Sequence, residues 1–174
     1  GAAGHYGLAT SILIIPGTLI GNAIAQVIYP ELSKRHHEGL SLTPTIRRAM
    51  LIMVATGALP FLIIAIAGPT IFETVFGLEW REAGLYAQLL VPFFFMQFMN
   101  RPAVAAIPVL RIQAGLFVYE IGSTTIKLAA MWIAFLLFKN QQAAIAAFSG
   151  AGALAYALLI FWVLSNAKRR VGHV

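Results

Sequence analysis

The sequence predicts an all-α fold, a polytopic membrane helix bundle with five transmembrane helices, and two observations carry that prediction. Of the 174 residues, 60% are hydrophobic and only 10% are charged, which leaves too little polar surface to cover a water-soluble domain. The apolar residues also gather in five long stretches separated by short charged or Pro- and Gly-rich breaks. A helix needs roughly 20 mostly apolar residues to cross a hydrocarbon core of about 30 Å, and every stretch reaches that length. The predicted spans are residues 6–29, 46–67, 83–110, 112–138 and 142–165.

The first two spans carry glycine and proline at positions that predict their packing and their ends. In the first span, Gly17 and Gly21 form a small-xxx-small pair that lets another helix approach closely. We expect Pro30 to end this span, so that residues 31–44 form a cytoplasmic loop or a short surface helix. The second span is expected to stop at residues 68–69, a Gly-Pro pair.

The third span is interrupted by Pro92, Pro102 and Pro108. Each proline removes a backbone donor, and a carbonyl freed within lipid must be satisfied by a neighbouring helix or by water. We therefore expect this span to face the bundle interior or a cavity. Three polar side chains lie near the middle proline: Gln97, Asn100 and Arg101.

These three side chains each have two interpretations. The amides of Gln97 and Asn100 serve either as hydrogen-bonding groups between helices, which is the commoner use, or as ligand contacts. Arg101 lies nearer the inner surface, so its guanidinium either reaches the cytoplasmic headgroups or enters a polar pathway.

The fourth span holds Glu120 and Lys127, seven residues and hence about two turns apart, on one helix face. Lys127 precedes Lys139 by 12 positions, about 18 Å of helix, so its ammonium does not simply reach the outer headgroups. An ionisable group at the bilayer centre costs roughly 3 to 17 kcal/mol. Glu120 and Lys127 therefore either pair with each other or with a neighbouring helix, or they line a substrate or ion pathway.

Basic residues flank the spans unequally, which predicts the orientation of the bundle. The fifth span is rich in small residues at 149–153 and is followed by the basic cluster 168–170. If the first helix runs from outside to inside, eight basic residues fall in cytoplasmic segments and two in outer loops, as the positive-inside rule favours. Five crossings then place the C-terminus in the cytoplasm. The cytoplasmic set is Lys34, Arg35, Arg47, Arg48, Arg111, Lys168, Arg169 and Arg170, and the outer set is Arg81 and Lys139.

The composition also excludes several classes of function. The chain has no cysteine, hence no thiolate metal site and no Cys nucleophile, and the adjacent His36 and His37 point in different directions on a helix. It has no Gly-rich phosphate loop, no Walker-type lysine and no nucleophile with a plausible base. The net charge of +6 flanks the helices instead of forming a nucleic-acid surface. We therefore expect no enzyme activity and no metal, cofactor or nucleic-acid partner.

Two stretches carry a resemblance to a known family. Residues 4–34, GHYGLATSILIIPGTLIGNAIAQVIYPELSK, have a Gly-x-Tyr-like start, a mid-helix proline, a glycine-rich middle and a closing Tyr-Pro-Glu-Leu. Residues 76–113, FGLEWREAGLYAQLLVPFFFMQFMNRPAVAAIPVLRIQ, have Phe-Gly-x-x-Trp-x-x-Ala-Gly, a proline-broken helix and an Arg-x-Gln exit. Together they cover about two-fifths of the chain. The chain thereby resembles bacterial polysaccharide and O-antigen flippases of the multidrug/oligosaccharidyl-lipid/polysaccharide exporter superfamily.

The resemblance implies a two-lobe flippase fold, with six helices in each lobe and a central cavity that opens alternately to either side. This chain is similar to the last five helices of the second lobe, so we expect residues 1–174 to form a single transmembrane domain, most of a C-terminal lobe, with the N-terminal lobe absent. The implied activity moves an undecaprenyl-pyrophosphate-linked oligosaccharide across the bacterial cytoplasmic (inner) membrane for polysaccharide or lipopolysaccharide export, often with ion counterflow. The implied partners are this anionic lipid-linked oligosaccharide, membrane lipids and the missing N-terminal lobe.

A pyrophosphate that leaves water must be neutralised, which makes basic side chains in such a cavity reasonable. The candidate substrate-binding residues are therefore Arg101, Lys127, Asn100 and Gln97, and Glu120 is the candidate ion-coupling residue. The family landmarks do not designate Arg101, Lys127 or Glu120. Where the family is expected to carry small or uncharged residues, this chain has Asn100 and Arg101, which are either a substrate contact peculiar to this member or a cytoplasmic-end anchor.

Two alternatives to a flippase stay open. A multidrug exporter of the same superfamily would need acidic residues to attract cationic drugs, whereas two basic residues here accompany one acidic residue. The other alternative is a non-transporting, half-size membrane subunit that packs against a partner.

Overall fold

A computed structural model describes residues 2–169, and within that range the chain is helical, with short turns and no strand. The elements are α1 (Ala2–His37), α2 (Thr43–Phe76), the 3-10 helix η1 (Leu78–Trp80), α3 (Arg81–Met99), α4 (Arg101–Leu110), α5 (Gln113–Phe138) and α6 (Gln141–Arg169). Over the described residues five segments are long and apolar enough to cross a membrane, the third being α3 and α4 together. The predicted all-α bundle of five spans is confirmed.

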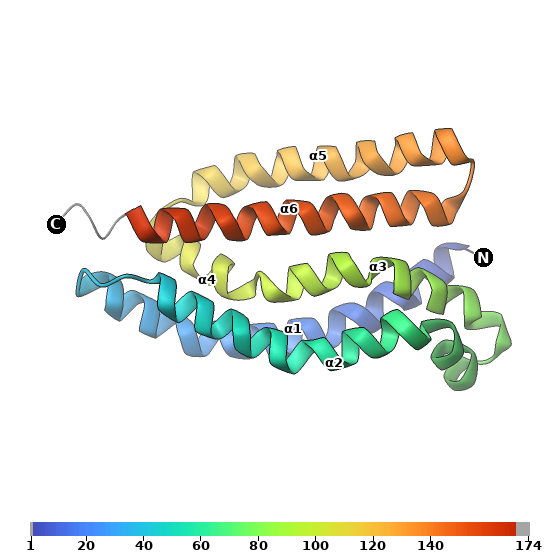
Figure 1. Ribbon diagram of the computed structural model, residues 1–174, viewed down its shortest axis with the longest axis horizontal. Helices are drawn as coiled ribbons and strands as arrows, with labels where there is room; N and C mark the ends of the chain where they lie inside the picture. The colour runs from blue at the N-terminus through green and yellow to red at the C-terminus, as the bar shows by residue number, and fades with distance from the viewer. Residues whose placement is uncertain (1, 170–174) are drawn as a thin grey trace.

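The α3–α4 segment lies in the middle of the bundle, with α1 and α2 on one side and the α5–α6 hairpin on the other (Figure 1). In the most apolar window of this third span 50% of the residues are buried, against 17% in α5, which packs mainly on α6. The expectation that the proline-rich span faces the bundle interior is therefore confirmed.

Glycines set how closely α1 and α2 approach this central segment. Gly17 of α1 and Gly57 of α2 both face the ring of Phe98, and Gly21 of α1 lies against the side chain of Arg101. The small-xxx-small pair of α1 is thus a helix-packing surface, as predicted. Further along, Gly68 and Gly84 bring the backbones of α2 and α3 together, because a Cβ on Gly68 would lie 2.6 Å from the Gly84 carbonyl oxygen.

Helix α1 continues through Pro30 to His37, which corrects the prediction that Pro30 ends the span. A proline removes one donor from the ladder, while the residues after it keep theirs, so the helix tolerates it. The end is set by Gly39, whose φ of 68° is left-handed, and by bonds from the Gly39 and Leu40 N–H groups to the His36 and Arg35 carbonyls at 3.2 and 2.9 Å. This is the Schellman arrangement for which glycine is preferred.

Helix α2 likewise runs past the predicted stop at residues 68–69 and ends at Phe76. Pro69 lies inside the helix, and Gly68 serves as the contact with α3 instead of as a terminator. Gly77 ends α2 with a φ of 105°, and its N–H donates to the Glu73 carbonyl at 2.9 Å.

Of the three prolines in the third span, one coincides with a break in the helix. Pro92 and Pro108 lie inside α3 and α4, whereas Pro102 stands in the first turn of α4, directly after the break at Asn100. The N–H of Phe93, next to Pro92, donates to the Ser149 hydroxyl of α6 at 3.3 Å. The neighbouring helix α6 therefore contacts the backbone beside this proline.

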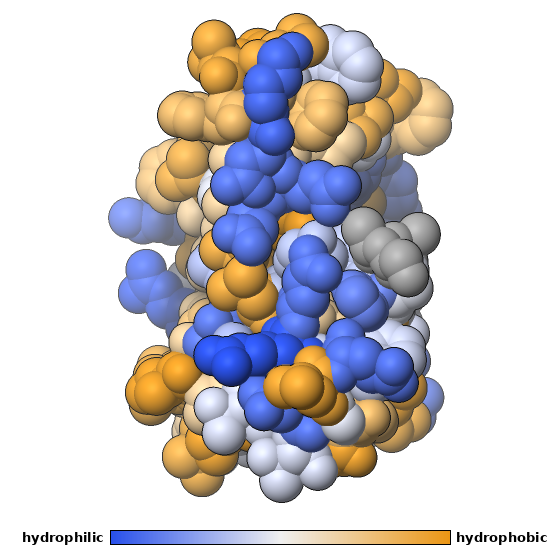
Figure 2. Space-filling view, turned by 90° about the vertical axis from the view of Figure 1, so that its right-hand side faces the viewer, coloured by the Kyte–Doolittle hydropathy of each residue, from blue (hydrophilic) through white to orange (hydrophobic). Residues whose placement is uncertain are grey.

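The end of the bundle at which α1 begins is polar, with hydrophobic residues around its edge (Figure 2). There His5 Nδ1 of α1 lies 3.3 Å from the Glu82 carboxylate of α3. The Tyr86 hydroxyl lies 2.8 Å from the same carboxylate and 3.1 Å from the Gln141 side-chain carbonyl of α6, so its single proton can go to either acceptor. These contacts tie three helices together at the water boundary.

Candidate functional site

The predicted site residues lie where the third span is broken and along the face of α5 that meets α6. Asn100 occupies the turn between α3 and α4 with 2% of its surface exposed, and its side-chain oxygen is buried without a hydrogen-bond partner. Its main chain is satisfied: the N–H donates to the Met96 carbonyl and the carbonyl accepts from the Val104 N–H, both at 3.0 Å. A buried, unpaired amide oxygen at a helix break is a group available to a ligand or a water molecule.

Gln97 lies one turn before the break and reaches α6. Its side-chain nitrogen donates to the Tyr156 hydroxyl at 3.0 Å. This contact agrees with the interpretation of Gln97 as an interhelical hydrogen-bonding residue. Tyr156 packs against both hydrophobic clusters of the bundle, one among α1, α2, α4 and α6 and the other mainly among α1, α2 and α3.

Lys127 points inward from α5, with 8% of its surface exposed, and therefore does not face acyl chains. Its ammonium nitrogen lies 5.8 Å from the ring centroids of both Phe93 and Tyr156. Within residues 2–169 no carboxylate lies in salt-bridge range of it, so the alternative in which Glu120 and Lys127 pair with each other is wrong for this conformation. The two aromatic faces supply the negative potential that stabilises the ammonium.

Glu120 is half-buried on α5. It lies nearer than Lys127 to the start of α5, at the end of the bundle where α1 turns into α2 (Figure 1). The neighbouring Tyr119 hydroxyl donates to the Ala155 carbonyl of α6, which holds this end of α5 against α6. Of the predicted site residues, Lys127 meets the ring of Tyr156 and Gln97 meets its hydroxyl.

Arg101 begins α4 and is half-buried between that helix and α1. The aliphatic part of its side chain covers Gly21, where a Cβ would lie 2.8 Å from the Arg101 Cγ. Arg101 and Gln97 line a hollow of about 10 Å³ beside Thr18, which is room for about one water molecule. A pyrophosphate group does not fit in it, so in this conformation the polar side chains are packed together and no vestibule is open at Arg101.

Three residues that the sequence did not single out complete this arrangement: Phe93, Ser149 and Tyr156. Gly152 of α6 makes room for Phe93 and Lys127, because its missing side chain leaves space for the Phe93 ring and the aliphatic part of Lys127. Only one feature of the sequence could have indicated these three residues. Tyr156 follows the small-residue stretch of the fifth span and lies four residues, about one helical turn, after Gly152.

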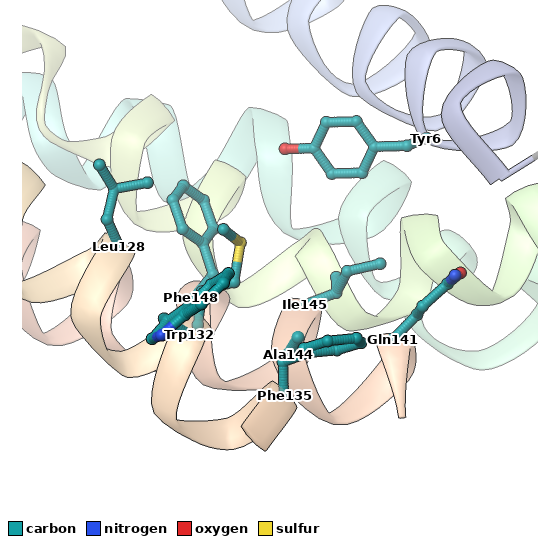
Figure 3. A pocket seen from close by; sticks show the side chains of 9 residues that line it. Tyr6, Leu128, Trp132, Phe135, Gln141, Ala144, Ile145 and Phe148 are labelled. Atoms are coloured by element: carbon teal, nitrogen blue, oxygen red, sulfur yellow. The ribbon is translucent and has the colours of Figure 1, made fainter. Parts of the chain in front are cut away.

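An apolar cleft of about 520 Å³ adjoins Lys127 on the side toward the polar end shown in Figure 2. Leu128 lines the cleft and directly follows Lys127, and Phe148 joins the cleft to Phe93, with ring centroids 5.2 Å apart. Tyr6 of α1 lies opposite, with its hydroxyl directed over the cleft (Figure 3). The full lining is Tyr6, Leu128, Met131, Trp132, Phe135, Gln141, Ala144, Ile145 and Phe148.

The described part of the chain holds no group of three or more His, Cys, Asp or Glu side chains placed to bind a metal ion. Away from the ends of the predicted spans, the charged residues that the structure describes are Arg101, Glu120 and Lys127, and the adjoining cleft is apolar. An amphiphile with an anionic group and a long apolar portion has the chemistry that matches both.

A comparison with known families finds a match for the first half of the chain. Residues 1–84 match a family described as polysaccharide biosynthesis protein. The matched region covers α1, α2, η1 and the first residues of α3, so all five candidate site residues lie beyond it. No curated protein matches the chain, and no solved structure matches it. The chain is a multi-pass membrane protein whose first half is similar to polysaccharide biosynthesis proteins.

Proposed function

We propose that this chain forms most of the C-terminal lobe of a flippase that moves an undecaprenyl-pyrophosphate-linked oligosaccharide from the inner to the outer leaflet of a bacterial cytoplasmic membrane. Alternating access of a cavity shared with a second, N-terminal lobe carries the substrate, and the C-terminus lies in the cytoplasm. The observation that carries the proposal is the pairing of intramembrane cations with an apolar cleft, in a chain similar to polysaccharide biosynthesis proteins.

In this proposal Arg101 and Lys127 neutralise the pyrophosphate, and Asn100 and Gln97 donate or accept hydrogen bonds. The cost of an unpaired charge within the bilayer supports that assignment, because such residues are retained mainly where they meet a substrate, an ion or each other. Lys127 meets two aromatic rings and no carboxylate among the described residues, so its ammonium is free to exchange a modest cation–π contact for a phosphate oxygen.

Transport also requires the packed site to open. The hollow beside Arg101 holds about one water molecule, so the substrate enters only after α1 or the α5–α6 hairpin moves away from α3. Glu120 is the group that takes up a coupling proton or cation in this proposal. Glu120 directly follows Tyr119, whose hydroxyl donates to the Ala155 carbonyl of α6, so a change in its charge takes place next to a contact between α5 and α6.

The test is complementation of a deletion strain with the full-length gene carrying Lys127→Gln or Arg101→Gln. We expect surface polysaccharide to fall and the lipid-linked oligosaccharide to accumulate on the cytoplasmic side. Lys139→Gln is the matched control, because it removes the same charge from an exposed position at the end of α5. Normal surface polysaccharide in the Lys127 variant, with the protein present in the membrane, would rule out the site assignment.

A multidrug exporter is the second candidate, and the charge of the site disfavours it. Arg101 and Lys127 are two cations beside the single carboxylate of Glu120. The resulting net positive charge of the site would repel cationic drugs. Unchanged drug susceptibility on deletion, together with loss of surface polysaccharide, distinguishes the two. A non-transporting subunit predicts neither change.

A further inference from the structure

A second groove lies at the opposite, basic end of the bundle, between the last turns of α1 and the first turns of α2 (Figure 1). Its volume is about 390 Å³, which is within the range of small-molecule sites. Its lining includes none of the charged candidate site residues Arg101, Glu120 and Lys127. The lining residues are Val27, Ile28, Glu31, Arg35, Pro44, Thr45, Arg48, Ala49 and Ile52.

The polar part of the groove carries a net positive charge. Arg35 comes from α1 and Arg48 from α2, and within residues 2–169 neither forms an ion pair with a carboxylate. The Nε of Arg35 donates to the Ser41 carbonyl at 3.2 Å, which fixes the side chain. The two terminal nitrogens of the guanidinium group can then donate to an anion. Two guanidinium groups on facing helices form a site suited to a phosphate.

The single acid in the groove is already engaged. Glu31 accepts a hydrogen bond from the Thr45 hydroxyl at 3.1 Å, which turns its carboxylate toward α2. The other acid at this end, Glu38, lies outside the groove, 4.0 Å from Lys34. One carboxylate therefore opposes two guanidinium groups, and the balance favours an anion.

The rest of the lining is apolar and lies deeper along both helices. Val27 and Ile28 are about two turns before Arg35 on α1, and Ala49 and Ile52 follow Arg48 on α2. Val27 and Ile52 are exposed at the side of the bundle, where a spanning protein meets acyl chains. The groove is thus polar toward water and apolar toward the bilayer.

We propose that this groove binds an anionic phospholipid of the leaflet at the basic end, with its phosphate on Arg35 and Arg48 and its acyl chains along Val27 and Ile52. Basic pockets between membrane helices at the cytoplasmic surface bind such headgroups. The lateral opening favours a lipid over a soluble anion, because a free phosphate leaves the apolar half of the groove unused. This inference is independent of what the protein transports.

Binding is measured by native mass spectrometry of the purified full-length protein in detergent, with added phosphatidylglycerol or phosphatidylcholine. We expect the Arg35→Gln/Arg48→Gln protein to bind phosphatidylglycerol about tenfold more weakly or worse. The matched control is Lys34→Gln/Arg47→Gln, which removes the same charge at the same end from residues that do not line the groove. Equal losses in the two double variants would overturn the proposal in favour of a diffuse surface charge.

A substitution of opposite sign sharpens the test. Glu31→Gln removes the one acid in the groove and keeps an acceptor for Thr45, so affinity for phosphatidylglycerol should rise several-fold. Glu38→Gln, outside the groove, should change it little. Should Glu31→Gln weaken binding, the phosphate is not at this position. Should phosphatidylcholine bind as well as phosphatidylglycerol, the groove does not select an anionic lipid and the proposal is overturned.

Two further measurements distinguish a lipid headgroup from a soluble phosphate and control for misfolding of the double variant. Inorganic phosphate at millimolar concentration should not displace the lipid, and displacement by phosphate would identify a soluble-anion site instead. Arg48→Gln alone leaves the Arg35–Ser41 bond intact, so a loss of affinity in that variant cannot be ascribed to a disturbed α1–α2 turn. Unchanged affinity in Arg48→Gln would contradict a shared site.

Discussion

The ammonium nitrogen of Lys127 lies 5.8 Å from the centroid of the Tyr156 ring, within the membrane-spanning part of the bundle. The hydroxyl of the same tyrosine accepts a hydrogen bond from Gln97. Tyr156 on α6 therefore joins α5 to α3 through two different interactions, one at its face and one at its polar tip. The two can be separated by substitution.

Tyr156→Phe keeps the ring and removes the hydroxyl, so only the contact with Gln97 is lost. We expect it to destabilise the bundle by about 0.6 kcal/mol, the average for a side-chain hydrogen bond between membrane helices. Tyr156→Leu also removes the cation–π contact, which is worth about 0.5 to 2 kcal/mol more. Unfolding of the purified protein by denaturing detergent measures both.

Tyr29→Phe is the control for that pair, since Tyr29 is exposed and forms no hydrogen bond within the described residues. If Tyr156→Phe and Tyr156→Leu proved equally destabilising, the ring of Tyr156 would have no measurable interaction with Lys127.

The contact of Phe98 with Gly57 gives a second prediction. A Cβ on Gly57 would overlap the Phe98 ring, so Gly57→Ala should cost about 1 to 3 kcal/mol through overpacking. The double variant Gly57→Ala/Phe98→Leu should recover part of that loss, because the smaller side chain leaves space. Gly122→Ala is the control: nothing lies within 4 Å of its Cβ, and alanine favours the helix. No rescue in the double variant would show that Gly57 matters for a reason other than the ring.

Hydropathy and proline spacing predicted the five spans and the broken third helix, because both follow from what the bilayer demands of a backbone. The ends predicted for the first two helices are wrong, and the reason is local. Pro30 and Pro69 lie inside α1 and α2, and these helices end instead at Gly39 and Gly77, two glycines with positive φ.

The candidate site was predictable only in part. Arg101, Glu120 and Lys127 stand out in sequence because charge is costly in lipid, and the structure places the ammonium of Lys127 against the ring of Tyr156. Tyr156 could not be predicted as part of the site from the sequence. A tyrosine in an apolar helix does not have the large free-energy cost in the bilayer that makes a charged residue stand out. The role of Tyr156 arises from the register of α6 against α3 and α5, which depends on packing at Gly152.

The crossing of Gly68 and Gly84 gives a third prediction, which contrasts with Gly57. A Cβ on Gly68 would lie 2.6 Å from the Gly84 carbonyl oxygen, and a backbone atom cannot turn aside as a ring can. Gly68→Ala should therefore cost more than Gly57→Ala, and the helices α2 and α3 must separate to relieve it. Trimming the nearby side chain with Gln88→Ala should not rescue the variant. Rescue by Gln88→Ala would mean that the side chain, not the backbone, limits the approach.

The position of Arg101 over Gly21 gives the fourth prediction, which separates stability from transport. In Gly21→Ala the new methyl group would lie 2.8 Å from the Arg101 Cγ, so the flexible arginine must move while the helices stay in place. The free energy of unfolding should change by less than about 1 kcal/mol, because alanine also raises the helix propensity of α1. If Arg101 contacts substrate, surface polysaccharide in the complemented deletion strain should nonetheless fall. Gly7→Ala is the control, since its Cβ meets no atom within 4 Å. Full transport by a Gly21→Ala protein, together with full transport by Arg101→Gln, would identify Arg101 as a helix-end anchor and remove it from the site.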